Sequence, residues 1–271
     1  MKHSLALPLF ALAVALYCLL PFLWFVLTSF KSPAQLTAMP PELIPSFHWE
    51  FYRSALVTHG LLRYIGNSLI VAGAATVISI TVGSLAAYAI ARFQLVWTKL
   101  YLLALLAISM FPQIAIAGPV WNILNHLDWL NSYQGLVTAY IALSLPLAIW
   151  ILTTFFGEVP VEIEEAALID GCSRVQALRK VVLPMAAPGI ITAALLVFIQ
   201  TWNEFFFALI IMTDPDLQTL PVGIALFPGE YTMPWGEIAA ASTLATLPLI
   251  FLTLFFQRGI IRGLSAGAVK G

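Results

Sequence analysis

The chain has 271 residues, of which 61% are hydrophobic and only 9% are charged, and its formal net charge at pH 7 is −1. With a mean hydropathy of +0.95, it is too apolar to be an ordinary soluble domain. No patch rich in basic and aromatic residues points to nucleic acid as a partner. We expect residues 1–271 to form a single membrane domain.

Apolar stretches long enough to cross a bilayer recur along the chain. A spanning helix needs about 20 mostly apolar residues, and six stretches qualify, at residues 5–30, 64–91, 100–124, 134–156, 187–212 and 238–262. The third is the least regular, because Pro112 and Gly118-Pro119 interrupt it. The first is too long for the apolar core of a secretion signal, so we expect it to be retained. The sequence predicts an all-α protein that crosses the membrane six times.

The distribution of Lys and Arg predicts the orientation of these spans. If the N-terminus is cytoplasmic, the inner segments hold nine basic residues and the outer segments three. The outer three are Lys31, Arg53 and Arg63. Basic residues gather on the cytoplasmic side of membrane proteins. We therefore expect both termini and the segment 157–186 to be cytoplasmic, with the chain in the cell membrane of a bacterium or archaeon.

The segment between the fourth and fifth spans is the most charged part of the chain. Eight of the 25 charged residues lie between Glu158 and Lys180. Pro160 suits the first turn of a helix, and Asp170-Gly171 is a typical helix stop, since Gly adopts the left-handed conformation. Ser173 can cap a second short helix. This pattern predicts a helix–turn–helix outside the membrane.

Two interpretations of this helix–turn–helix remain open at this point. It could rest on the bilayer surface as an amphipathic helix, or it could dock on another protein. Three acidic residues at its start would be repelled by an anionic leaflet, and Ala166 and Ala167 offer little apolar area to lipid. Small side chains allow a protein surface to come close, so the pattern favours docking.

The same segment resembles the EAA loop of the permease subunits of ABC importers, whose pattern is EAA-x3-G-x9-I-x-L-P. Here Glu165-Ala166-Ala167 is followed by Gly171 and by Val181-Val182-Leu183-Pro184, so the only departure is Val181 in place of Ile. The stretches "FPQIAIAGPVWNILNHLDWLNSYQGL", "WNEFFFALI" and "QRGIIRGLSAGAVKG" resemble the carbohydrate-importer branch, in particular the maltose-type permease that ends in a cytoplasmic tail, which would be residues 259–271 here.

The resemblance implies a set of partners and a coupling role. It implies a dimer of ATP-binding cassette subunits, a second and different permease subunit, an external solute-binding protein, a carbohydrate substrate and the surrounding lipid. It assigns contact with the ATPase to Glu165, Ala166, Ala167, Asp170, Gly171, Arg174, Leu183 and Pro184. The chain has no G-x4-GK[ST] phosphate loop. We therefore expect no catalytic residues and no cofactor in this chain, with ATP and Mg²⁺ bound by the partner ATPase.

A polar cluster in the fifth apolar stretch is the candidate for the substrate path. It consists of Gln200, Trp202, Asn203 and Glu204. Amides and a carboxylate can bind sugar hydroxyls, and an aromatic face can stack on a sugar ring. An ionisable residue inside a span should face a cavity or a partner. Alternatively, Glu204 makes a structural hydrogen bond to a neighbouring helix.

Other functional classes have less support in the sequence. An autonomous secondary transporter or channel is the alternative function, but it usually needs several intramembrane ionisable groups, and only Glu204 qualifies. An intramembrane enzyme would need paired catalytic groups, which we do not find. The four histidines show no metal-ligand spacing, so we expect no metal site.

Overall fold

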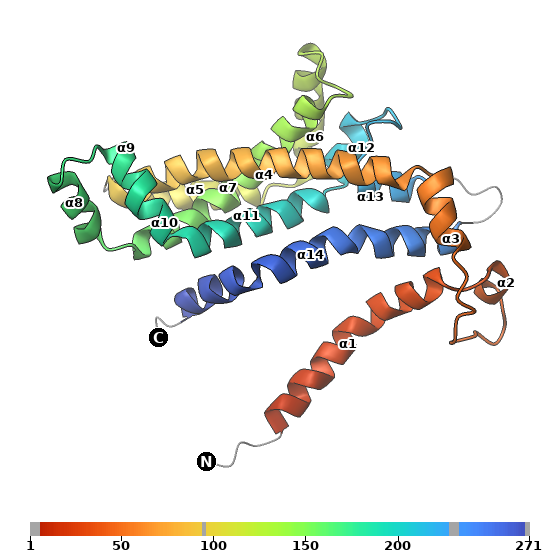
Figure 1. Ribbon diagram of the computed structural model, residues 1–271. Helices are drawn as coiled ribbons and strands as arrows, with labels where there is room; N and C mark the ends of the chain where they lie inside the picture. Colours follow the sequence, from red (N-terminus) through yellow and green to blue (C-terminus); the bar gives the residue numbers. More distant parts are fainter. Residues whose placement is uncertain (1–5, 94–95, 228–232, 269–271) are drawn as a thin grey trace. The chain divides into compact units, whose positions relative to one another are not determined.

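The computed structural model describes residues 6–93, 96–227 and 233–268, and in these residues all regular structure is helical (Figure 1). The N-terminal half contains α1 (Ala6–Ser29), α2 (Pro33–Leu36), α3 (Glu50–Arg53), the π-helical turn η1 (Ser54–Thr58), α4 (Leu61–Arg92), α5 (Thr98–Ser109) and α6 (Gln113–His126). The C-terminal half contains α7 (Tyr133–Glu158), α8 (Val161–Ile169), α9 (Arg174–Ala177), the π-helical turn η2 (Leu178–Val182), α10 (Leu183–Met185), α11 (Ala187–Trp202), α12 (Phe206–Ile211), α13 (Leu220–Ala225) and α14 (Trp235–Ala268).

Four helices are long and apolar enough to cross a membrane: α1, α4, α7 and the first part of α14. Two further pairs of helices meet the same criterion only together, each bent at a short break. They are α5 with α6, bent by 89°, and residues 174–185 with α11, bent by 79°. The described residues are thus all-helical in their regular structure and hold four to six candidate spans.

Two of the predicted spans are not continuous helices. The stretch 100–124 breaks between α5 and α6, because Pro112 cannot donate a backbone hydrogen bond and disfavours helical geometry at Phe111. The stretch 187–212 breaks at residues 203–205, between α11 and α12. The predicted tail, residues 259–271, continues α14 as helix to Ala268, and its last three residues lie outside the described part.

The chain divides into two compact units. The first consists of Met1–Ile65 with Val222–Pro248, and the second of Gly66–Pro221 with Leu249–Gly271. In the first unit, Phe51, Tyr52 and Ala240 are buried together. The Phe51 ring lies against Gly236, where an added Cβ would come within 2.3 Å of it. None of the most apolar window of α1 is buried inside the chain, so this helix is left free to face lipid or another protein.

The second unit is built around α7, the most buried of the long helices, which packs along α11. Gly189 of α11 lies against the Phe155 ring of α7, where an added Cβ would come within 2.1 Å of the ring. This glycine lets the two helices approach closely, as small residues do in membrane proteins. Between α4 and α7, the Ser79 and Ser144 hydroxyls are hydrogen-bonded at 2.9 Å.

The two ends of this second unit have different characters. At one end, α8 and α9 extend beyond α4, α7 and α11 (Figure 1). At the opposite end, α6 and α12 meet, and Asn131 accepts a backbone hydrogen bond from Asp214 at 2.8 Å. The polar groups most relevant to function lie at the first end and beside the break between α11 and α12.

Candidate functional site

The connection between α7 and α11 folds as the predicted helix–turn–helix. α8 ends at Ile169, and Gly171, two residues later, has a φ of +89°. The Gly171 amide donates to the Leu168 carbonyl at 3.1 Å, and the Cys172 amide donates to the Ala167 carbonyl at 3.0 Å. These two bonds form the Schellman motif, which satisfies the last carbonyls of a helix and requires a left-handed residue. The predicted stop at Gly171 is confirmed.

The second short helix of this connection has its own cap. The Ser173 hydroxyl accepts from the Gln176 amide, and the Gln176 side chain accepts from the Ser173 amide. This capping box satisfies two backbone donors that the helix leaves open, and it confirms the predicted cap at Ser173. We call residues 157–186 the coupling loop, and its two caps are made entirely from its own residues.

The side of the coupling loop that faces away from the protein carries most of the residues assigned to ATPase contact. Glu165, Ala166, Asp170, Gly171, Arg174 and Pro184 are exposed, and Ala167 and Leu183 are half-buried. Leu183 packs in part against the core of the second unit. Ile169 and Val175, which are not among the residues assigned to ATPase contact, are 86% and 74% exposed. Large apolar side chains with this exposure, outside the predicted spans, are typical of a surface that another protein covers.

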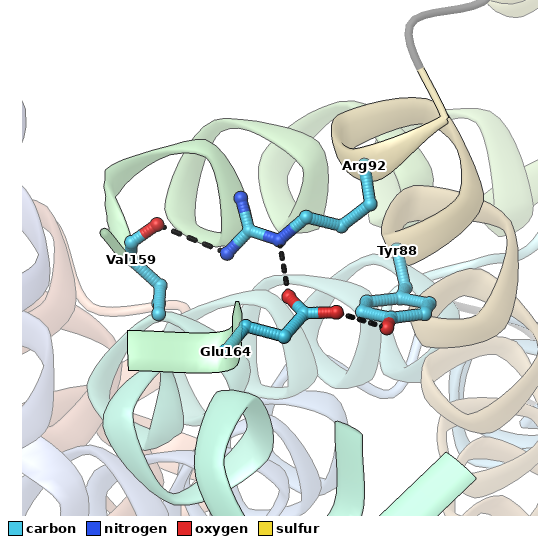
Figure 2. Close-up of polar contacts among 4 residues, drawn as sticks. All are labelled: Tyr88, Arg92, Val159 and Glu164. Atoms are coloured by element: carbon cyan, nitrogen blue, oxygen red, sulfur yellow. Dashed lines mark hydrogen bonds and ion pairs between the residues drawn. The ribbon is translucent and has the colours of Figure 1, made fainter. Parts of the chain in front are cut away.

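A buried ion pair fixes the coupling loop to the end of α4 (Figure 2). The Arg92 Nε donates to the Glu164 carboxylate at 2.6 Å, and the two side chains are only 5% and 4% exposed. The other carboxylate oxygen of Glu164 accepts from the Tyr88 hydroxyl. A terminal guanidinium nitrogen of Arg92 donates to the Val159 carbonyl at 2.9 Å. We call Tyr88, Arg92 and Glu164 the clamp.

The clamp has no local signature in the sequence. There, Arg92 is one of nine inner basic residues, and Glu164 is one of three acids at the start of the helix–turn–helix. The two positions are 72 residues apart, and nothing in either neighbourhood pairs them. The one available signal was the cost of burying a charge, because an acid on the inner face of a short helix must find a cation.

A second contact holds the other half of the coupling loop to the same end of α4. The Arg174 guanidinium lies 5.3 Å from the centre of the Phe93 ring, a cation–π geometry. Below it, Leu178 and Val182 are buried in the core of the second unit, together with Leu152 and Phe156 of α7. The coupling loop is therefore joined to both α4 and α7.

A cavity of about 310 Å³ lies beside the break between α11 and α12. Its polar lining comes from three helices and from the break itself: Gln113, Tyr140, Gln200, Thr201, Asn203 and Glu204. The volume is at the lower end of the range for ligand pockets, about 300–1,000 Å³. Three of the four residues proposed for the substrate path, Gln200, Asn203 and Glu204, therefore lie together.

Trp202 and Glu204 have structural partners. Trp202 is 3% exposed, stacks on Phe198 at 5.6 Å between ring centres, and does not line the cavity. The Glu204 carboxylate accepts from the backbone amides of Phe207 at 2.9 Å and of Ala208 at 3.1 Å. It thus caps α12 and stabilises the break, which corresponds to the structural alternative for this residue. Glu204 also lines the cavity.

Comparison with known proteins identifies relatives along almost the entire chain. Residues 79–266 match the family model described as "binding-protein-dependent transport system inner membrane component". The chain is 41% identical to the trehalose/maltose transport system permease protein MalG of Thermococcus litoralis, over 96% of this chain and 95% of that protein. It is 40% identical to the sulfoquinovosyl glycerol transport system permease protein SmoH of Agrobacterium fabrum, over 93% and 89%.

The fold also has a counterpart among solved structures. A chain from the crystal structure of a bacterial ABC transporter that imports the acidic polysaccharide alginate matches with a TM-score of 0.77 and 21% identity. The match covers 95% of this chain and 99% of that chain. At this level of identity, the similarity establishes a shared fold.

Proposed function

The chain belongs to the family of binding-protein-dependent transport system inner membrane components, and from this we propose that it forms half of the translocation path of an ATP-driven carbohydrate importer. Membership in this family does not fit the alternative of an autonomous secondary transporter or channel. The single observation that carries the mechanism is the clamp, which joins an exposed docking surface to α4 through a buried ion pair.

Carbohydrate is the proposed substrate class. The two relatives are named for the transport of trehalose/maltose and of sulfoquinovosyl glycerol, which share sugar chemistry. The cavity at Gln200, Asn203 and Glu204 offers amide and carboxylate groups to sugar hydroxyls. We propose that it lies on the substrate path, with Glu204 holding the break that shapes it.

The proposed assembly has several further parts. Two ATP-binding cassette subunits bind ATP and Mg²⁺, a second and different permease supplies the other half of the path, and an external binding protein delivers the sugar. The chain crosses the membrane six times as a single domain, with α5 and α6 together as one span and α11 as another, and both of its termini are cytoplasmic. The nine-to-three division of basic residues supports this orientation.

The proposed mechanism uses the coupling loop as a lever. Glu165, Ala166, Ala167 and the exposed Ile169 and Val175 contact the ATPase subunit. When the two ATPases close, they displace the loop, and the clamp passes this displacement to α4 while the buried Leu178 and Val182 pass it to α7. Movement of rigid helices about a fixed site changes which side of the membrane the cavity faces.

The test uses the complete transporter, purified through a tag on this chain and reconstituted in lipid. ATP hydrolysis and sugar uptake are measured with a panel of sugar-loaded binding proteins from the same organism. The proposal predicts that one of them stimulates both activities. Uptake by the isolated chain, without an ATPase and without ATP, would falsify it.

A further inference from the structure

A second and larger hollow lies in the first unit, remote from the coupling loop along the chain. It has a volume of about 790 Å³ and is walled by the end of α1, by α2 with the loop that follows it, and by the start of α14. Its walls are mainly apolar and include Trp24, Phe25 and Trp235. Trp24 and Phe25 lie one turn before the end of α1.

The hollow contains a buried cation that has no anionic partner among the described residues. Lys31 lines it and is only 4% exposed. Its ammonium lies 4.5 Å from the centre of the Trp24 ring, and among the described residues no acid or carbonyl pairs with it. A buried charge is costly unless it is paired and hydrogen-bonded. The aromatic ring offsets only part of that cost.

An unpartnered hydroxyl lies in the same hollow. The Thr28 Oγ1 is buried and has no hydrogen-bond partner in the described part of the chain, and Thr28 also lines the hollow. Buried polar groups are nearly always hydrogen-bonded, so an orphaned one calls for a ligand or a water molecule. Thr28 and Lys31 are three residues apart where α1 ends, so one ligand group can meet both.

From this hollow we infer a binding site for the phosphate group of an anionic phospholipid. The ammonium of Lys31 neutralises the phosphate, the Thr28 hydroxyl donates a hydrogen bond to it, and the apolar walls receive the glycerol and the first acyl carbons. A lysine at the end of a span characteristically extends its ammonium to the headgroup layer, and tryptophans gather at that same depth.

The surroundings of α1 favour lipid over an acidic side chain of a protein partner. No residue in the most apolar window of α1 is buried, and large apolar side chains such as Leu16, Tyr17 and Leu20 are exposed on it. Acyl chains that lie along this exposed helix would reach the hollow. An isolated carboxylate from another chain would satisfy Lys31 but would leave the apolar walls of the hollow uncovered.

The test measures lipid binding by the tag-purified complex after delipidation in detergent. Brominated dioleoyl phosphatidylglycerol is titrated while tryptophan fluorescence is recorded, with brominated dioleoyl phosphatidylcholine as the zwitterionic comparison. Lys31→Met, which keeps most of the side chain but removes the charge, should weaken phosphatidylglycerol binding about tenfold, as expected for a hydrogen bond to a charged group. Lys31→Arg should bind like the wild type.

Two further variants keep the result interpretable. Lys99→Met removes an exposed lysine elsewhere in the chain and should leave lipid binding unchanged. Thr28→Val preserves volume, so it tests the site even if Lys31→Met folds poorly, and it should weaken phosphatidylglycerol binding about fivefold. Phosphatidylcholine carries the same phosphate, but its choline compensates the charge, so Lys31→Met should weaken its binding less than it weakens phosphatidylglycerol binding.

Two outcomes would overturn the lipid site. One is equal affinity of the wild type and Lys31→Met for phosphatidylglycerol. The other is release of a partner subunit from the Lys31→Met complex in size-exclusion chromatography, with lipid binding unchanged, which would identify a protein carboxylate as the anion. Neither outcome bears on the transport function, because lipid binding is measured without ATP or sugar.

Discussion

Arg92 and Glu164 form an ion pair at 2.6 Å between the last residue of α4 and the inner face of α8. Both side chains are almost fully buried, and Tyr88 and Val159 complete the hydrogen bonding (Figure 2). A buried pair is strongly disfavoured when one partner is removed, because the remaining charge stays uncompensated. This contact is therefore well suited to transmit movement between the coupling loop and α4.

Removing one charge of the clamp should uncouple the proposed transporter. Arg92→Met leaves Glu164 buried without a cation, at a cost of about 3–5 kcal/mol, so the contact between loop and helix should open. We expect sugar uptake per ATP hydrolysed to fall severalfold, while the ATPase subunits still co-purify. Uptake and ATP hydrolysis measured on the same proteoliposomes give this ratio.

Glu162→Gln is the matched control for the clamp, since Glu162 lies on the same short helix but is exposed. It should leave the ratio of uptake to hydrolysis unchanged. The double variant Arg92→Glu/Glu164→Arg should recover part of the coupling lost in Arg92→Met. Normal coupling in Arg92→Met would show that the clamp is only a packing contact.

Enlarging the docking surface should block contact with the ATPase. Ala166 is exposed on α8, so Ala166→Trp should insert into the membrane normally yet fail to retain the ATPase subunits during purification. Ala166→Ser, which remains small, should retain them. The measurement is the amount of ATPase recovered per tagged chain, and equal recovery for the two variants would argue against docking through this surface.

Substitutions of Gly171 can test the backbone strain of this turn, because a larger side chain would not clash with its neighbours. Its φ is +89°, and an added Cβ would meet nothing within 4 Å, so only backbone strain opposes substitution. Gly171→Val should cost about 1–3 kcal/mol locally, whereas Gly171→Asn should cost less, because Asn adopts the left-handed conformation more readily. In limited proteolysis, the coupling loop should be cleaved most slowly in the wild type, faster in Gly171→Asn and fastest in Gly171→Val. Equal cleavage of all three would exclude strain at this turn.

The cavity residues should separate into binding and structural roles. Gln200→Ala should weaken sugar affinity in uptake kinetics without changing assembly, and Gln134→Ala, at an exposed position outside the cavity, should change neither.

Glu204→Gln should lose one of the two amide contacts that cap α12, which costs about 1 kcal/mol. We expect it to lower the amount of assembled complex first. An unchanged yield with altered affinity would instead make Glu204 a direct sugar contact.

The orientation of the chain can be read by cysteine labelling in a background where Cys18 and Cys172 are replaced. Val175 is 74% exposed on the coupling loop, so a cysteine at this position should react with a membrane-impermeant reagent only after the cells are opened. A cysteine at exposed Thr213, which lies beyond α12 at the opposite end of the second unit, should react in intact cells. The reverse pattern would invert the predicted topology.

Local patterns in the sequence predicted the local structure well. The cap at Ser173 and the stop at Gly171 depend on a few neighbouring residues, so the sequence suffices to place them. The breaks at 110–112 and 203–205 were harder, since apolar content is continuous across them. At the second break, the Tyr140 hydroxyl of α7 donates to the Glu204 carbonyl at 3.3 Å. Nothing in the sequence near residues 203–205 indicates this contact.

Contacts between residues far apart in the chain could not be predicted from the sequence. The clamp joins residues 72 positions apart, and the orientation of Trp202 into the protein interior depends on how α11 packs. Chemical suitability selected Trp202 as a sugar contact, but a tryptophan is equally suited to a core. The exposure of Ile169 and Val175 was missed for a related reason, because hydrophobicity alone predicts burial.

The coupling loop carries both of its caps within its own sequence, whereas the ion pair that fixes it draws Arg92 from α4. The residues that determine its shape therefore lie in one continuous segment, but the residue that attaches it does not. Exchange of this segment between related genes should yield working hybrids only where the recipient already has an arginine at the end of the corresponding helix. During evolution, the loop and the codon for that distant arginine should therefore be retained or lost together.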